Sequence, residues 1–345
     1  MKTRSGNVDL ARFIAAMLIM AHHIYYLGSN YYPFKDAGIY VEFFLLMTGY
    51  YTAKHYGKAV VEDKYKDALV YTVKKFKPLF LYLVIATVSA YLIQGFCGIA
   101  YGGWSFQIFI RSFYNNFLPD LFLLSTSYAE PLVVPLWYIS GMIIVFPIFC
   151  LLVQLKNRYL KIILCSVIPI FYYGKTEMVG IRTYPHGMLR ILIGMMVGVL
   201  IYELSVVLEK QVEQIPKWVR TTIEVVCFIF PIYGCYNNFV GINVTSNYVY
   251  FLEFMICLFF AMPGFSHTSE IKGKAFNYLG ELSMLIFIFH WPVAMLINAV
   301  AVKHIITLPY KIIIYYVLTI GLSVWLKERK NKGITNVRFL FKKNN

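Results

Sequence analysis

The chain has 345 residues, of which 59% are hydrophobic and only 14% are charged, and its formal net charge is +15. Soluble globular domains contain about 25% charged residues, so this composition excludes a soluble fold. Apolar runs of about 20 residues recur along the chain, and each is long enough to cross a bilayer as a helix. We therefore expect an all-α, polytopic integral membrane protein.

Ten apolar runs predict about ten transmembrane helices. In chain order they cover 8–28, 37–53, 78–97, 132–153, 160–174, 187–205, 219–236, 248–263, 279–300 and 308–326. With both termini in the cytoplasm, Lys and Arg favour the cytoplasmic segments by roughly four to one, which explains the positive charge without nucleic acid. We expect one membrane domain over 1–345, with a core at about 8–326, a short basic cytoplasmic tail at 327–345 and no appended soluble catalytic domain.

The first run, "VDLARFIAAMLIMAHH" (8–23), contains Arg12, His22 and His23. A charge near the bilayer centre costs at least about 2.5–3.5 kcal/mol, so such a residue is functional by default. Eleven residues advance an α-helix by three turns and about 20°, which places Arg12 and His23 on one face, roughly 16–17 Å apart. His22 points about 80° away, so His23 is the better partner.

This face suits an elongated anionic ligand. Arginine binds phosphate through its planar fork, and histidine transfers protons near neutral pH. We therefore place phosphates at Arg12, near the cytoplasm, and a reactive group at His23. The alternative is that Arg12 extends to the lipid headgroups and His23 only packs.

Two further charged residues lie at the expected outer ends of spans. Glu42, in "VEFFLLMTGYY" (41–51), has a depth close to that of His23. It either orients that imidazole or benefits from a helix N-terminus. Arg190 begins the sixth span, and it either faces the acceptor, where it could stabilise an oxyanion, or extends to the interface.

Two connecting segments have unusual composition. The expected cytoplasmic loop at 54–77 is rich in lysine, and it either faces lipid or attracts an anionic donor. The outside loop at 98–131 is rich in aromatic residues, which predicts an interfacial helix or a lid.

Two late stretches add polar and aromatic candidates. "PLWYISG" (135–141) contains Trp137 and Ser140, and we expect the serine to pack between helices. "LGELSMLIFIFHWPV" (279–293) contains His290 and Trp291 before a proline that predicts a kink. His290 either lines the same tunnel or bonds to another helix. The six cysteines lack metal-ligand spacing, so we expect packing residues and no metal.

Taken together, these stretches resemble acyltransferase family 3, integral-membrane O-acyltransferases that modify bacterial polysaccharides and related acceptors. The first span resembles the family signature of an arginine, ten residues and a histidine. "VEFFLLMTGYY" is similar to the acidic-Phe-Phe segment, with Thr48-Gly49-Tyr50 in place of Ser-Gly-Phe/Tyr. "PLWYIS" resembles the Leu-Trp motif, and "YLGELSMLIFIFHWPV" resembles the late helix ending in His-Trp-Pro. The resemblance covers nearly the whole chain.

The resemblance implies an acyl-CoA donor, most often acetyl-CoA, and a hydroxyl of a cell-surface or lipid-linked glycan as acceptor. It implies that Arg12 holds the CoA phosphates, that His23 is the general base and that Glu42 supports it. The expected supporting residues are Arg190, His290, Trp137, Ser140, Trp291 and His22. We expect a multi-pass protein of the bacterial cytoplasmic membrane. The alternative function is a glycan flippase or secondary transporter without acyl transfer.

Overall fold

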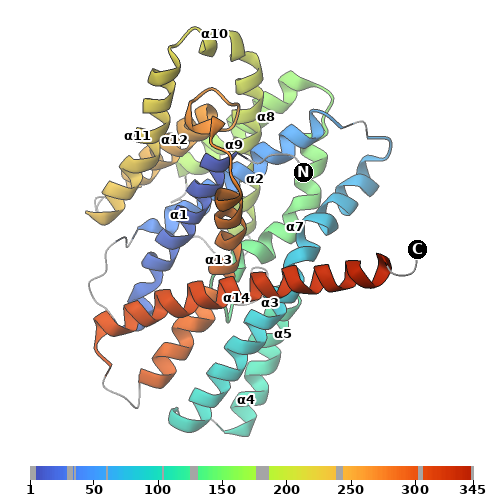
Figure 1. Ribbon diagram of the computed structural model, residues 1–345. Coiled ribbons are helices and arrows are strands. Elements are labelled where there is room, and N and C mark those ends of the chain that lie inside the picture. Colours follow the sequence, from blue (N-terminus) through green and yellow to red (C-terminus); the bar gives the residue numbers. More distant parts are fainter. Residues whose placement is uncertain are drawn as a thin grey trace.

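The computed structural model describes residues 5–28, 34, 36–59, 61–102, 105–124, 131–175, 186–237, 244–301 and 306–342. These residues form helices and connecting turns, without a β-strand among them (Figure 1). The all-helical class expected from the sequence is therefore confirmed.

Among the described residues, ten long helices follow one another in the same order as the ten expected spans. They are α1 (Gly6–His22), α2 (Tyr40–Tyr56), α3 (Lys64–Tyr101), α7 (Leu136–Val153), α8 (Arg158–Lys175), α9 (His186–Val207), α11 (Lys217–Tyr236), α12 (Val244–Ala261), α13 (Lys274–Ala301) and α14 (Leu308–Lys342). Shorter turns of helix are η1 (His23–Leu27), η2 (Ala37–Ile39), α4 (Phe106–Ser112), η3 (Phe113–Phe117, a π-turn), α5 (Leu118–Leu121), α10 (Glu209–Glu213) and η5 (Thr268–Glu270).

Seven helices of the described chain are long and apolar enough to cross a membrane. They lie at Gly6–Leu27, Lys64–Ala100, Leu136–Val153, Gly187–Val207, Lys217–Tyr236, Lys274–Val300 and Leu308–Arg329. The other three expected spans overlap α2, which has 17 residues, α8, which carries three basic residues, and the short apolar helix Tyr248–Ala261. The structure thus supports seven spans, while the full count of ten and the cytoplasmic side of both ends stay predictions.

The basic segment before the third span is largely helical and not a loop. α3 begins at Lys64, about four turns before the expected start at 78. The Asp63 carboxylate caps it by accepting hydrogen bonds from the backbone N–H groups of Tyr65 and Lys66, at 3.0 and 3.1 Å. This extension places Lys75 on the wall of a helix. At the other end of the chain, α14 continues through most of the expected tail, to Lys342.

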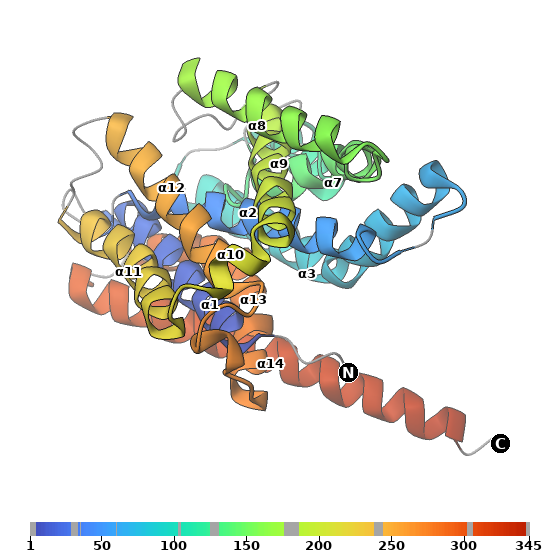
Figure 2. The same cartoon turned by 90° about the horizontal axis from the view of Figure 1, so that it is seen from above.

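Two groups of helices organise the core. α1 lies along α13, and α9 packs against α2, α7 and α8 (Figures 1 and 2). At the α2–α9 crossing, a Cβ on Gly49 or Gly198 would overlap the backbone of the opposite helix. Small residues allow such a close approach between helices in a membrane. The crossing fixes the position of α2 relative to α9.

The aromatic segment expected outside the membrane contains the described helical segment α4–η3–α5, while its place at a membrane interface stays a prediction. The segment packs on α3, where the Tyr91 ring lies 4.9 Å from that of Phe109 and its hydroxyl donates to the Phe109 carbonyl at 3.1 Å. Phe106 and Tyr114 remain 75% and 61% exposed. Aromatic residues at the surface of such a segment suit a membrane interface.

Candidate functional site

A cavity of about 790 Å³ lies between α1, α2, α3, α7, α13 and α14. Its size lies within the range of small-molecule sites, about 300–1,000 Å³. Most of its wall is apolar, and its polar and charged lining residues are Asp9, Arg12, Thr48, Tyr51, Lys75, Tyr82, Tyr138, Glu281 and Lys327.

Two of the three cations in this cavity face a carboxylate. Arg12 Nη1 lies 3.4 Å from Asp9 Oδ1, and Lys327 Nζ lies 3.1 Å from Glu281 Oε2. The third, Lys75, has its ammonium 4.8 Å from the centre of the Phe146 ring, and no carboxylate of the described residues lies within ion-pair distance. Lys75 therefore gives the cavity a surplus positive charge.

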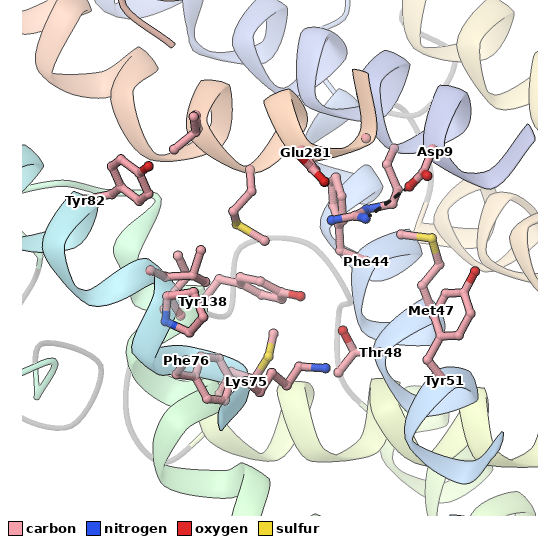
Figure 3. Close-up of a pocket in the computed structure, with 18 of the residues that line it drawn as sticks. Asp9, Phe44, Met47, Thr48, Tyr51, Lys75, Phe76, Tyr82, Tyr138 and Glu281 are labelled. Atoms are coloured by element: carbon pink, nitrogen blue, oxygen red, sulfur yellow. Dashed lines mark hydrogen bonds and ion pairs between the residues drawn. The ribbon is translucent and has the colours of Figure 1, made fainter. Parts of the chain in front are cut away.

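Hydrogen-bond donors from three helices point toward the same space. Figure 3 shows Lys75 on α3, Thr48 on α2 and Tyr138 on α7 directed toward one another across the cavity. An ammonium group and two hydroxyls form a donor set that suits phosphate or carbonyl oxygens. The charge and the donor type of this part of the cavity wall therefore suit an anionic ligand.

Arg12 and His23 both lie on the side of α1 that faces α13. Near Arg12, the cavity is closed by Gly280 and Glu281 of α13. Farther along, the buried His23 ring stacks on His290 of α13, with centroids 5.2 Å apart, and meets the edge of Trp291 at 5.1 Å. α1 ends at His22, so His23 begins the 3₁₀ turn η1. Both groups therefore lie along one seam, which we call the α1–α13 seam.

An aromatic ring separates the cavity from the two imidazoles. Among the described residues that line the cavity, neither His23 nor His290 appears. The Phe287 ring lies 5.8 Å from Tyr138, on the cavity wall, and 6.0 Å from the ring of His290. The Phe287 ring is therefore in contact with both the cavity wall and the imidazole pair.

Glu42 pairs with Arg190 and not with His23. The carboxylate is fully buried, and its Oε1 accepts a hydrogen bond from Arg190 Nε at 2.5 Å. Its Oε2 accepts a second from the Tyr173 hydroxyl at 3.5 Å. The Arg190 guanidinium lies 5.2 Å from the ring centre of Trp137. Glu42 therefore does not orient His23 as expected. It belongs to a separate cluster with Arg190, Tyr173 and Trp137, where α2 and α9 approach closely.

The remaining candidates are Ser140, Trp291 and His22. The Ser140 hydroxyl donates to the carbonyl of Leu123, and Trp291 Nε1 donates to that of Leu132 at 3.2 Å. These two bonds fasten the connection between α5 and α7, so Ser140 bonds a loop and not another helix. The half-buried His22 ring lies 4.8 Å from that of His23 and contacts Gly38 of η2.

The model of acyltransferase family 3, described as an acyltransferase domain, matches residues 5–328. The chain belongs to this family. Comparison with curated proteins and with solved structures found no match. The protein is therefore an acyltransferase-family membrane protein, and the resemblance inferred from its motifs is confirmed.

The sequence patterns missed most of the polar residues that line the cavity, among them Lys75, Tyr138, Glu281 and Lys327, and they also missed Tyr173 beside Glu42. Lys75 was one of the lysines of an expected loop, and Lys327 was counted in the tail. An Asp63 cap followed by a helical run would have indicated an earlier start of α3. Within the described residues of the acyltransferase, no group of three His, Cys, Asp or Glu side chains is placed to hold a metal ion.

Proposed function

We propose that this acyltransferase transfers an acetyl or other short acyl group from acyl-CoA to a hydroxyl of a cell-surface or lipid-linked glycan, at the bacterial cytoplasmic membrane. One observation carries the proposal. The cation-lined cavity and the His23–His290 pair lie along the same α1–α13 seam, at the two ends of an interval of eleven residues.

The length of this interval suits coenzyme A. Its phosphates are at one end of the molecule and its thioester at the other, joined by an extended arm. The interval between Arg12 and His23 is roughly 16–17 Å in an α-helix. Phosphates at the cavity would bond Arg12 and Lys75, and their charge would compensate the surplus cation.

The apolar wall between the two ends suits the arm of the donor. Met284 and Leu285 of α13 line the cavity on the way from Glu281 toward Phe287. Displacing the Phe287 ring would open the path to the imidazoles, so the thioester would reach His23 from the cavity side. Water would be excluded there, because both imidazoles are buried.

His23 would act as the general base. Its imidazole takes the proton from the acceptor hydroxyl while the oxygen attacks the thioester carbonyl. The new C–O bond forms, the C–S bond breaks, and the departing CoA thiolate takes the proton from the imidazolium. General-base catalysis of this kind contributes about 10²–10⁴-fold to a rate. Glu42 and Arg190 would hold the α2–α9 framework of the site.

Acyl transfer by the purified protein tests this proposal. The full chain in detergent micelles is mixed with radiolabelled acetyl-CoA and candidate glycans, and label on the glycan is measured. We expect transfer by the wild type and by His55→Ala, but not by His23→Ala. His55 is the matched control because it is exposed and stacks on Tyr71 at 4.4 Å, away from the seam. Absence of label on any glycan would reject the proposal, and glycan movement without CoA consumption would indicate a transporter.

A further inference from the structure

His290 on α13 has a ring nitrogen that the proposed reaction leaves unused. The side chain is fully buried, and its Nδ1 lies 3.1 Å from the carbonyl oxygen of Ile286, one turn earlier. In the part of the chain that the structure describes, its Nε2 has no hydrogen-bond partner. An unpaired buried polar atom is costly and rare, so this nitrogen requires an explanation.

The contact with Ile286 determines which nitrogen carries the hydrogen. A carbonyl oxygen only accepts hydrogen bonds, so Nδ1 is the donor in the neutral ring. Nε2 then has a lone pair and acts as an acceptor. A doubly protonated ring would put a charge and an unpaired N–H in a fully buried position, which is far less favourable. Among the described residues, His290 is therefore a neutral acceptor without a donor.

The position of His290 indicates where that donor comes from. Its ring stacks on His23, with centroids 5.2 Å apart and an angle of 28° between the planes. In the proposed function the reacting hydroxyl meets His23, so a neighbouring hydroxyl of the same acceptor would lie beside His290. Of two hydroxyls on adjacent carbons, one could donate to His23 and the other to His290, with donor–acceptor distances of roughly 2.7–3.0 Å.

We propose that His290 Nε2 accepts a hydrogen bond from a hydroxyl adjacent to the one that is acylated. The acceptor is then a molecule with neighbouring hydroxyls, such as a sugar ring, and His290 determines this specificity. The inference rests on the proposed function. An alcohol with one hydroxyl leaves Nε2 unpaired, and sites built to bond a hydroxyl discriminate strongly against analogues that lack it. Both imidazoles are buried, so the acceptor reaches them only when a side chain that covers them, such as Phe287, moves.

Two substitutions of His290 separate this role from a packing role. In His290→Asn the short amide reaches the Nδ1 position, so it retains the bond to Ile286 and has nothing at Nε2. In His290→Gln the longer amide offers a carbonyl oxygen near the Nε2 position. We expect kcat/KM for the acceptor to fall about three- to tenfold in the Asn variant, with the Gln variant closer to wild type. If His290 only packs and bonds Ile286, the Asn variant should instead have the higher kcat/KM of the two. His55→Gln is the matched control.

Methyl hexopyranosides and their monodeoxy analogues serve as acceptor probes. Removing the hydroxyl next to the acylated one should lower kcat/KM in the wild type and have little further effect in His290→Asn. Equal losses in both proteins, or equal activity of the Asn and Gln variants, would overturn the inference and leave the proposed function intact. A wild type that transfers no acyl group would overturn both.

A measurement independent of turnover checks the tautomer. In ¹⁵N-histidine-labelled full-length protein, His290→Gln identifies the His290 signals by their loss from the NMR spectrum. We expect an unprotonated Nε2 and a protonated Nδ1 in the wild type at neutral pH. A protonated Nε2 would overturn the inference whatever the activity.

Discussion

The two ends of the α1–α13 seam contain opposite kinds of chemistry. At one end, Arg12, Lys75 and Lys327 line an open cavity, where a ligand can compensate their charge. At the other end, His23 and His290 are closed in among aromatic rings, where a lasting charge would be costly. Under the proposed function, the cations at one end bind the donor, and His23 at the other end takes the proton from the acceptor.

The strongest test of this difference in role is His23→Ala. We expect kcat to fall about 10²–10⁴-fold, because the general base is removed, with the affinity for CoA unchanged. Steady-state kinetics and calorimetric titration with CoA measure the two quantities. A large loss of CoA affinity in this variant would mean that the two ends do not act separately.

Glu42→Gln tests the Glu42–Arg190 pair, which belongs to neither end of the α1–α13 seam. It leaves the Arg190 charge buried without its carboxylate, which costs about 3–5 kcal/mol of stability. Denaturation in detergent should show this loss, while turnover per folded molecule stays near the wild-type value. The double variant Glu42→Gln/Arg190→Met should recover part of the stability. A variant as stable as wild type but inactive would restore the role of Glu42 in catalysis.

Lys75→Gln tests the cavity end. A hydrogen bond to a charged group contributes about 1.5–3 kcal/mol, so we expect roughly 10- to 100-fold weaker CoA binding with little change in kcat. Lys74→Gln is the matched control, since it removes the same charge from the adjacent, exposed position of α3. Binding is measured by calorimetry at two salt concentrations. The same loss of CoA affinity in both variants would mean that the net charge of the protein, and not the position of Lys75, causes it.

Arg12→Lys should have a smaller effect than Lys75→Gln. The substitution keeps the charge, which Asp9 already compensates in part at 3.4 Å, and removes only the planar fork. We expect roughly three- to tenfold weaker CoA binding with an unchanged midpoint of thermal unfolding. CoA titration and thermal scans of the same preparation measure this. An unchanged affinity would remove Arg12 from the phosphate site.

The smallest effect is expected outside the cavity and the imidazole pair, at the exposed pair between Glu270 of η5 and Lys217. The hydrogen bond and the charge of Lys217 lower the pKa of the Glu270 carboxyl below its ordinary value. The pair therefore stabilises the fold above the unfolded-state pKa, and this contribution is lost as the pH falls through the folded-state pKa. Glu270→Gln should lower the thermal midpoint slightly at pH 7 and not at strongly acidic pH. A shift independent of pH and salt would contradict this.

The Arg12–His23 alignment was predictable from the sequence, because it depends only on the period of one helix. The partner of Glu42 was not predictable in the same way. Glu42 and Arg190 are 148 residues apart in sequence, and they meet because α2 and α9 cross closely at Gly49 and Gly198. The position of Lys75 on a helix was not predicted for a local reason. α3 begins at the Asp63 cap, in a stretch whose many charged residues do not resemble a membrane span.

The sequence by itself determined that this protein is an all-helical membrane protein with the motifs of acyltransferase family 3. Composition, run length and spacing within one helix are properties of the chain, and they need no knowledge of its neighbours. Only the tertiary structure decided which charges compensate one another, and that His290 stacks on His23 while Glu42 does not reach it. Those choices depend on distances between helices far apart in sequence, which are set by packing.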